Sequence, residues 1–344
     1  MIDLAVRHFA LPLRHPFTIS RGTVAVQDTV IVQLGEQGCH GYGEATTNPY
    51  YGVTVESLTR QISAVAPLLR RCTTDDLEGL LDGLAAELGD DMFARCALDM
   101  AAHDLWGKRL GRPVHGLWGL DPAAGPLSNY TIGIDTPERM VAKLAEVPGW
   151  PIYKIKLGTD RDLEIVRELR RHTDRPFRVD ANCGWTVRQA IDYSGPLADL
   201  GVEFIEQPLA ADDPGMAEVR RHSALPVFAD ESCAVEGDVE TCAERFHGIN
   251  IKLVKCGGLA PARRMIARAR ELGLRVMCGC MTESTVGISA LAQIVPQLDH
   301  VDMDGAALLA ADIAAGVVVE DGRRRYPDRP GTGVELLDGP LPGA

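Results

Sequence analysis

Short apolar strands recur at a steady spacing along the second two thirds of this 344-residue chain. The strands that we expect cover residues 129–134, 151–157, 177–181, 203–207, 226–230, 248–253, 274–279 and 300–304. Polar residues lie at the ends of these strands: Asp180 follows Lys154 by 26 residues, and Glu206 follows Asp180 by another 26. Helical segments separate the strands. A strand and a helix about every 25 residues are typical of a β/α barrel, although this spacing also allows an open doubly wound sheet.

The N-terminal part of the chain has a different pattern. Residues 29–35 and 39–45 are predicted to be two strands joined by a turn. Three segments carry apolar side chains at helical spacing: residues 54–70, 74–88 and 91–110. Strands followed by helices predict an α+β unit ahead of the barrel.

Composition argues against several classes of function. The net charge is −13 and no basic run occurs, so we expect no nucleic-acid partner. No window approaches the roughly 18 apolar residues of a membrane span, and the N-terminal residues do not resemble a signal peptide. The nine cysteines are an odd number without the spacing of a zinc site, which predicts free thiols in a cytoplasmic protein.

Three consecutive strand segments end in a carboxylate: Asp180 in RVDAN, Glu206 in FIEQP and Asp230 in FADES. The C-terminal strand ends of a β/α barrel lie on one rim, about 4.8 Å apart. Three converging carboxylates repel one another unless a cation lies between them, and oxygen ligands suit Mg²⁺ or Mn²⁺. Asn182 and Glu231 lie beside these ligands, and we expect them to orient the acids. The alternative is that each acid only caps a helix.

Lysines flank these acids along the sequence. Lys154 and Lys156 are two residues apart and so share one face of a strand, and Lys252 lies in the strand after the third acid. A divalent metal on a substrate carboxylate stabilises the enediolate that forms when the α-proton leaves. A lysine removes that proton only when it is neutral, and the positive charges of Lys154 and the metal favour neutral Lys156.

We therefore predict that Lys156 and Lys252 are the acid/base groups on opposite faces of a substrate, with Lys154 in support. The alternatives are a surface lysine at position 252 and simple ion pairs at positions 154 and 156. Lys255 lies three residues beyond Lys252, so it is expected to face elsewhere on the strand and to have a structural role.

On these motifs the chain resembles the enolase superfamily, in its muconate-lactonising subgroup. The motifs are KIK (154–156), DAN (180–182), EQP (206–208), ADES (229–232) and NIK with the later GG (250–258). Lysine bases with Mg²⁺ are a known solution in that superfamily. The resemblance implies an α/β fold: a (β/α)7β modified TIM barrel over residues 126–319, an N-terminal α+β capping domain over residues 1–125, and a tail, 320–344, that returns to the capping domain.

Within that subgroup the chain resembles the dipeptide epimerases of the L-Ala-D/L-Glu type. GCMTES (279–284) and VDMDG (301–305) carry this likeness. It implies that Asp302 and Asp304 bind the ammonium group of a dipeptide, which two carboxylates on one strand face suit physically. The alternative is a pair of capping aspartates. Thr131 and Met281 are further candidates for substrate binding.

Two cap segments are expected to close over the substrate. PFTISRG (16–22) resembles the mobile loop of the family, and TTNPYYGVT (46–54) is expected to shape the same pocket. The resemblance implies that Arg21 binds the side-chain carboxylate of the substrate. The alternative for Arg21 is a solvated loop arginine.

The sequence thus predicts a Mg²⁺-dependent dipeptide epimerase that moves a proton at the α-carbon of the C-terminal residue, with a substrate like L-Ala-Glu. A cycloisomerase, an o-succinylbenzoate synthase or an N-succinylamino acid racemase would share the lysines and the acids, but none of them needs the ammonium pocket of Asp302 and Asp304. A non-catalytic binding barrel is the alternative of another class. Assembly into a homo-oligomer is left open.

Overall fold

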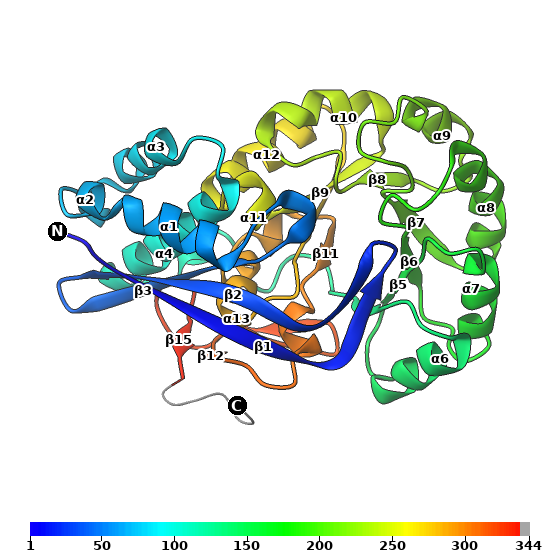
Figure 1. Cartoon of the computed structure of the whole chain (residues 1–344), viewed down its shortest axis with the longest axis horizontal. Coiled ribbons are helices and arrows are strands. Elements are labelled where there is room, and N and C mark those ends of the chain that lie inside the picture. The colour runs from blue at the N-terminus through cyan, green and yellow to red at the C-terminus, as the bar shows by residue number, and fades with distance from the viewer. Residues whose placement is uncertain (338–344) are drawn as a thin grey trace.

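Eight parallel strands lie in the C-terminal two thirds of the chain and form one sheet. They are β4 (Tyr130–Ile132), β5 (Tyr153–Lys156), β6 (Phe177–Asp180), β7 (Val202–Glu206), β8 (Val227–Ala229), β9 (Gly248–Lys252), β10 (Arg275–Gly279) and β11 (His300–Asp302). Neighbours in the sheet follow the chain order, and a parallel bridge between Ser128 and Val301 joins its two edges. The sheet of this computed structural model, which describes residues 1–337, is therefore a closed barrel (Figure 1).

Helices connect the first seven barrel strands to the next strand and cover the outside of the barrel (Figure 1). They are α6 (Pro137–Glu146), α7 (Asp162–Arg170), α8 (Val187–Asp199), α9 (Met216–His222), α10 (Val239–Arg245), α11 (Leu253–Cys256), α12 (Leu259–Glu271) and α13 (Thr285–Ala292). The last strand, β11, leads into a 3-10 helix, Gly305–Leu308, and not into an eighth α-helix. The predicted (β/α)7β barrel is confirmed.

Local sequence explains why these elements form where they do. The middle of each barrel strand is apolar and buried, as Ile155, Val179 and Ile251 illustrate. The helix α8 begins at a capping box, in which Thr186 and Gln189 satisfy each other's backbone N–H groups. The polar strand ends and loops therefore stay free to build a site on the rim.

The N-terminal α+β unit consists of an antiparallel sheet and a set of helices. Its strands are β1 (Asp3–Ile19), β2 (Gly22–Glu36) and β3 (Cys39–Thr46), paired in that order. Its helices are α1 (Val55–Ala64), α2 (Ala66–Leu69), α3 (Leu77–Leu88), α4 (Met92–Arg109) and α5 (Val114–Leu117). The sequence predicted two strands, so the strand β1 was missed. Prolines at positions 12 and 16 argue against a strand, and the register with β2 shifts between Pro12 and Phe17.

The predicted helix over residues 54–70 is wrong in its extent, because it divides into α1 and α2. Pro67 is the second residue of α2, and a proline disfavours helical backbone in the residue before it. The predicted helix over residues 74–88 likewise starts with a 3-10 turn, Thr74–Asp76, before α3.

The long helix α4 is almost entirely buried between the cap sheet and the barrel. Two glycines of β3 permit this packing. A side chain at Gly43 would place its Cβ only 1.9 Å from the carbonyl oxygen of Ala97. On the barrel side, Oδ1 of Asp99 in α4 accepts a hydrogen bond of 2.6 Å from the N–H of Leu259, at the start of α12. The cap is thus fixed to one side of the barrel.

The β1–β2 hairpin extends from the cap across the barrel mouth (Figure 1). Near its tip, the carbonyl of Thr18 accepts a hydrogen bond of 2.8 Å from Ile134, beyond β4. The hydroxyl of Ser20 donates to the carbonyl of Asn182, beyond β6, at 2.8 Å. The tip therefore rests on the loops after two barrel strands and covers the rim where the candidate site lies.

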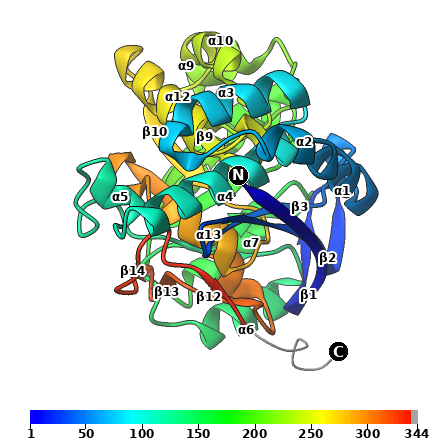
Figure 2. The ribbon, with the colours of Figure 1, turned by 90° about the vertical axis from the view of Figure 1, so that its left-hand side faces the viewer.

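The end of the described chain contacts the helices of the cap, beside which Figure 2 shows it. The N–H of Thr332 donates to Oδ1 of Asp104 at 2.7 Å, and the N–H of Val114 donates to the carbonyl of Gly331 at 2.8 Å. Short strand pairs join β12 (Ala314–Ala315) to β15 (Glu335–Leu336) and β13 (Val318–Glu320) to β14 (Arg323–Arg325). The domain bounds stay a prediction, and residues 338–344 of the predicted tail lie outside the described residues.

Within residues 1–337, the helices lack the combined length and apolar character that a membrane span requires.

Candidate active site

The three acids that the sequence places on successive strand ends lie together in the structure. Asp180 ends β6, Glu206 ends β7, and Asp230 directly follows β8. One oxygen from each lies within 4.8 Å of the others, and all three side chains are buried. Strand register produces this arrangement, because Asp180 pairs with Lys156 of β5 on one side and with Glu206 on the other.

This carboxylate cluster has the oxygen donor set that suits a divalent cation. Within the described chain, Oε2 of Glu206 accepts no aligned hydrogen bond, even though Nζ of Lys154 lies 2.8 Å from it. Burial and the charge of Asp180 raise the pKa of Glu206 to about 7. By contrast, Lys156 and Lys154 outweigh burial and lower the pKa of Asp180 to about 2. Hard, crowded oxygen ligands of this kind fit Mg²⁺.

The three candidate lysines contact this cluster from two sides. Nζ of Lys156 lies 2.7 Å from Oδ2 of Asp180, and Nζ of Lys252 lies 2.7 Å from Oδ2 of Asp230. Lys154, which is 1% exposed, lies 3.2 Å from Asp180 and 2.8 Å from Glu206. Burial alone would lower the pKa of Lys154, but the surrounding carboxylates raise it well above its usual value. Lys154 therefore remains an ammonium beside Lys156.

Lys255 contacts the cluster as well. The prediction that it faces away along a strand is wrong, because the strand β9 ends at Lys252 and Lys255 lies in α11. Its ammonium donates to the backbone carbonyl and to Oδ1 of Asp230, the latter at 2.7 Å, and to the carbonyl of Cys233 at 2.9 Å. Lys255 thus fixes the position of Asp230 through contacts to its backbone and its side chain.

The residues next to the acids also lie at the site. The backbone N–H of Asn182 donates to Oδ1 of Asp180 at 2.9 Å, and the residue adopts a φ of 43° to do so. Oε1 of Glu231 lies 2.6 Å from the guanidinium of Arg21. The structure therefore directs Asn182 toward an acid of the cluster, whereas the carboxylate of Glu231 pairs with the cap.

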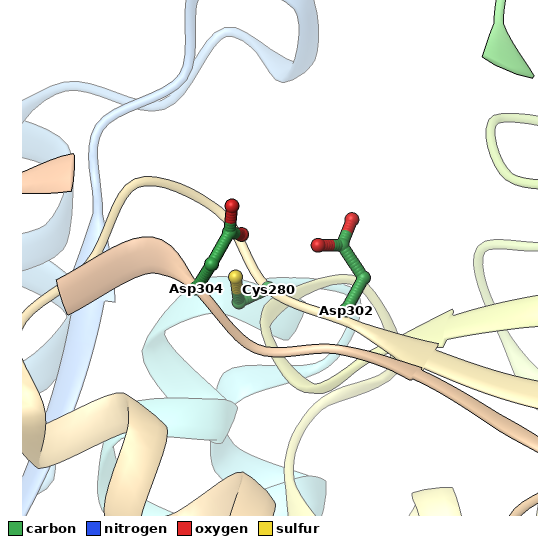
Figure 3. Close-up of side chains that lie close together, drawn as sticks. All are labelled: Cys280, Asp302 and Asp304. Atoms are coloured by element: carbon green, nitrogen blue, oxygen red, sulfur yellow. The ribbon is translucent and has the colours of Figure 1, made fainter. Parts of the chain in front are cut away.

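A second group of polar side chains lies at the end of β11. The carboxylates of Asp302 and Asp304 point the same way, with the thiol of Cys280 between them (Figure 3). The N–H of Thr131 donates to Asp304 at 2.5 Å, and its hydroxyl donates to Asp302 at 3.4 Å. Nζ of Lys154 lies 2.8 Å from Asp302, so Lys154 links this group to the carboxylate cluster.

Comparison with known proteins identifies the family of the chain. Residues 1–119 match the N-terminal domain of the mandelate racemase/muconate lactonizing enzymes, and residues 138–339 match the enolase C-terminal domain-like family. The chain belongs to the mandelate racemase/muconate lactonizing enzyme family. The predicted resemblance to the enolase superfamily and to its muconate-lactonising subgroup is confirmed.

Several members of this family are very similar to the chain. It is 51% identical over 337 residues, 98% of this chain and 100% of the other, to an L-Ala-D/L-amino acid epimerase of Flavobacterium johnsoniae. It is 53% identical over 340 residues, 97% of this chain and 99% of the other, to one of a Maribacter species. A dipeptide epimerase from Enterococcus faecalis, complexed with Mg and L-Leu-L-Tyr, superposes with a TM-score of 0.92 at 29% identity and covers 97% of this chain and 99% of its own.

In this member of the family, the cap and the barrel rim enclose a cleft of about 560 Å³. The candidates Arg21, Thr131 and Met281 line it, together with Lys154, Lys156, Lys252, Asp230, Asp302 and Asp304. The guanidinium of Arg21 also donates to the carbonyl of Asn182 at 3.0 Å and lies 4.5 Å from the ring centre of Tyr50. Arg21 is thus a lining residue of the cleft whose charge is already paired with Glu231.

Sequence reasoning missed Asn250, which acts on the carboxylate cluster. Asn250 is fully buried in β9, and its Nδ2 donates to Oε1 of Glu206 at 2.8 Å. It lies two residues before Lys252 and so shares the face of that lysine. The alternation of side chains along NIK could have identified it.

Sequence reasoning also missed Glu44, a buried acid of the cap strand β3. Its carboxylate accepts hydrogen bonds from the hydroxyls of Thr29 at 2.8 Å and Ser284 at 2.6 Å. It also accepts from the N–H of Ser284 at 3.0 Å and of Gly287 at 2.9 Å, at the start of α13. Glu44 therefore anchors the barrel loop that carries Met281 to the cap.

Proposed function

We propose that this protein is a Mg²⁺-dependent dipeptide epimerase that inverts the α-carbon of the C-terminal residue. The observation that carries the proposal is the position of Lys156 and Lys252. Each contacts an acid at one end of the carboxylate cluster, and the three strands that end in acids lie between their own strands. Relatives at 51% and 53% identity that act as L-Ala-D/L-amino acid epimerases support it.

Asp180, Glu206 and Asp230 are the residues that would hold the metal. Mg²⁺ bound there withdraws electron density from the carboxylate of the substrate and so makes its α-proton more acidic. The Mg complex of the E. faecalis epimerase supports Mg²⁺. Mn²⁺ has similar ligand preferences, and its use in place of Mg²⁺ stays a prediction.

The lysines transfer the proton. One neutral lysine takes the α-proton on its face of the substrate, and the protonated lysine on the opposite face returns a proton to the same carbon. The outcome is inversion, with one proton lost and one gained. Lys154 remains charged beside Lys156 and favours its neutral form by repulsion.

The remaining polar residues would hold the two ends of the dipeptide. Asp302 and Asp304 form an anionic pocket for the N-terminal ammonium, and a charge-assisted contact there selects a free amino group. The side chain of the second residue would project toward the cap, where Arg21 lines the cleft. An acidic side chain would have to compete with Glu231 for Arg21. Activity on an L-Ala-Glu-like dipeptide is therefore a stringent test of the role given to Arg21.

The proposal is tested by incubating the protein with Mg²⁺ and a library of dipeptides in D₂O. Mass spectrometry should detect a mass gain of one unit in dipeptides with a small first residue. Chromatography of the same samples should show that the opposite stereoisomer has formed. Lys156→Ala should prevent inversion of the same dipeptides. A wild-type protein that incorporates no deuterium into any dipeptide would contradict the proposal and favour a binding protein. A homo-oligomeric assembly and a cytoplasmic location stay predictions.

A further inference from the structure

A buried arginine lies inside the barrel, on the side of Asp180 away from the rim. Arg178 precedes Asp180 by two residues in β6 and shares its face, and only 2% of it is exposed. A buried guanidinium costs free energy unless its donors are paired. Arg178 donates to Glu203 at 3.0 Å, to the carbonyl of Val301 at 3.1 Å and to Oδ1 of Asn129 at 3.0 Å.

Asn129 connects this arginine to the carboxylate at the end of β11. It is fully buried, and its Nδ2 donates to Oδ1 of Asp302 at 2.7 Å. A guanidinium only donates hydrogen bonds, so Asn129 must turn its oxygen toward Arg178. The amide group then has no choice but to present its N–H donor to Asp302.

The remaining partners of Asp302 complete a fixed orientation. Oδ2 faces the ammonium of Lys154 at 2.8 Å, while Oδ1 faces Asn129 and the hydroxyl of Thr131. Both oxygens therefore have assigned donors, and the plane of the carboxylate is set from inside the barrel. Asp304, by contrast, receives its hydrogen bond from the backbone of Thr131.

We propose that Arg178 and Asn129 are positioning residues that orient the carboxylate of Asp302 for the ammonium group of the dipeptide, an inference that rests on the proposed function. Among the side-chain contacts of Arg178, the one to Asn129 leads to the carboxylate of Asp302. The relay affects how strongly the enzyme recognises a free amino group and leaves the proton transfer between the two lysines intact.

The test compares L-Ala-L-Glu with N-propionyl-L-glutamate, which has the same shape but lacks the ammonium group. Asn129→Leu removes the donor to Asp302, and Asn129→Asp replaces it with a repelling carboxylate of the same size. Each should raise KM for the dipeptide and reduce the wild-type preference in kcat/KM for the ammonium substrate by roughly tenfold or more, the effect of losing a hydrogen bond to a charged group. The kcat of the dipeptide should change much less.

Arg178→Met should reduce the same preference, and it should fold, because the carboxylate that loses its partner, Glu203, is 35% exposed and can be hydrated. In the double variant with Asn129→Leu, the methionine should add no further loss. Arg170→Met is the matched control. Arg170 lies over the ring of Phe177 and, among the described residues, donates only to backbone carbonyls, so the preference should be unchanged.

An unchanged preference in folded Asn129→Leu and Asn129→Asp proteins would overturn the proposal. So would a further loss when Arg178→Met is added to Asn129→Leu, because Arg178 would then act by another route. Should Arg178→Met fail to fold, Arg178→Lys, which keeps the charge but not the fork of donors, takes its place. A wild type without activity on any dipeptide would contradict the proposed function, whereas an active wild type with unaffected variants contradicts the relay alone.

Discussion

The barrel rim and the cap contribute to the site in different ways. On the rim, strand register alone brings Lys156, Asp180 and Glu206 to one level. The same holds across the barrel, where Lys252, Gly279 and Asp302 are register partners. Ladder hydrogen bonds on both sides of each strand fix these positions, so the groups assigned to the chemistry have little freedom to move.

The cap presents its residues to the same cleft from a hairpin tip and a loop. Arg21 is held by Glu231, the carbonyl of Asn182 and the ring of Tyr50, and 30% of its side chain is exposed. Tyr50 itself is 47% exposed. Partly exposed side chains can exchange partners when a ligand enters. We therefore expect the rim to determine the reaction and the cap to determine which substrate side chains are accepted.

The largest expected effect is on the rim. Lys156→Ala and Lys252→Ala should each reduce epimerisation by roughly 10²- to 10⁴-fold, because each removes one of two proton-transfer groups. Each variant should still exchange the α-proton of one stereoisomer with solvent, which NMR in D₂O would detect. Lys143 of α6 pairs with Asp135, just before that helix, so Lys143→Ala is the control and should keep full activity. Full epimerase activity in either site variant would exclude the two-lysine scheme.

Metal removal should have an effect of similar size. A chelator should stop α-proton exchange, and Mg²⁺ should restore it, because the substrate carboxylate then regains its electrophilic partner. Mg²⁺ at about a hundred times its dissociation constant should also stabilise the fold by about 2.7 kcal/mol, measured as a rise in Tm. Glu206→Gln should lose that rise. An equal rise in the variant would place the metal elsewhere.

The rim could be predicted from the sequence because its information is local and periodic. KIK, DAN, EQP and ADES lie at strand ends at regular spacing, and a closed parallel barrel converts equal spacing into proximity. Asn250 follows the same rule, but its amide is uncharged and does not stand out among the charged residues of these motifs. Asn129 precedes its strand, and its importance depends on Arg178, a partner 49 residues away.

The cap could be predicted only in outline. Its helices follow apolar periodicity, but β1 contains two prolines and its side chains are mostly exposed or half-buried, so neither pattern nor propensity identified it. The pairing of Arg21 with Glu231 joins residues 210 positions apart through loops, and nothing in either segment specifies it. Glu44 likewise acts on a loop 240 residues away. Contacts of this kind come from the docking of two units, not from a repeat.

A smaller effect should come from the cap. Arg21→Ala should lower kcat/KM for L-Ala-L-Glu more than for L-Ala-L-Leu, by roughly ten- to a hundredfold in the ratio, which is the worth of one charge-assisted contact. Arg7 is an exposed arginine of the same hairpin, and Arg7→Ala should leave the ratio unchanged. A wild type that prefers a cationic or apolar second residue would contradict the role of Arg21 without touching the epimerase assignment.

The junction of the two regions should give a several-fold effect. Glu44 accepts four hydrogen bonds through its two oxygens. In Glu44→Gln, one oxygen becomes an NH₂ group that faces N–H and O–H donors and cannot accept from them. The loop that carries Met281 therefore loses its anchor to the cap. We expect a lower Tm and a KM raised several-fold, with α-proton exchange retained. Glu36→Gln, at another buried acid of the cap sheet that pairs with Arg109, should lower Tm without changing KM. A KM that stays at the wild-type value in Glu44→Gln, as in Glu36→Gln, would show that the cap does not position this loop.

The smallest expected effect is a pH dependence at the same junction. Burial and the charge of Glu44 raise the pKa of Glu283 to about 8, whereas the unfolded chain ionises a glutamate at about 4.3. The unfolded state therefore binds fewer protons than the folded state between these values, and the free energy of unfolding falls as the pH rises through that window. Glu283→Gln removes this term, so its Tm relative to the wild type should increase by a few degrees from pH 5 to pH 8. Hydrogen bonds from Thr73 and Thr74 outweigh burial and lower the pKa of Glu36, so the Glu36→Gln difference should stay constant over that range. A constant difference for Glu283→Gln as well would mean that Glu283 is already ionised in the folded protein over this range.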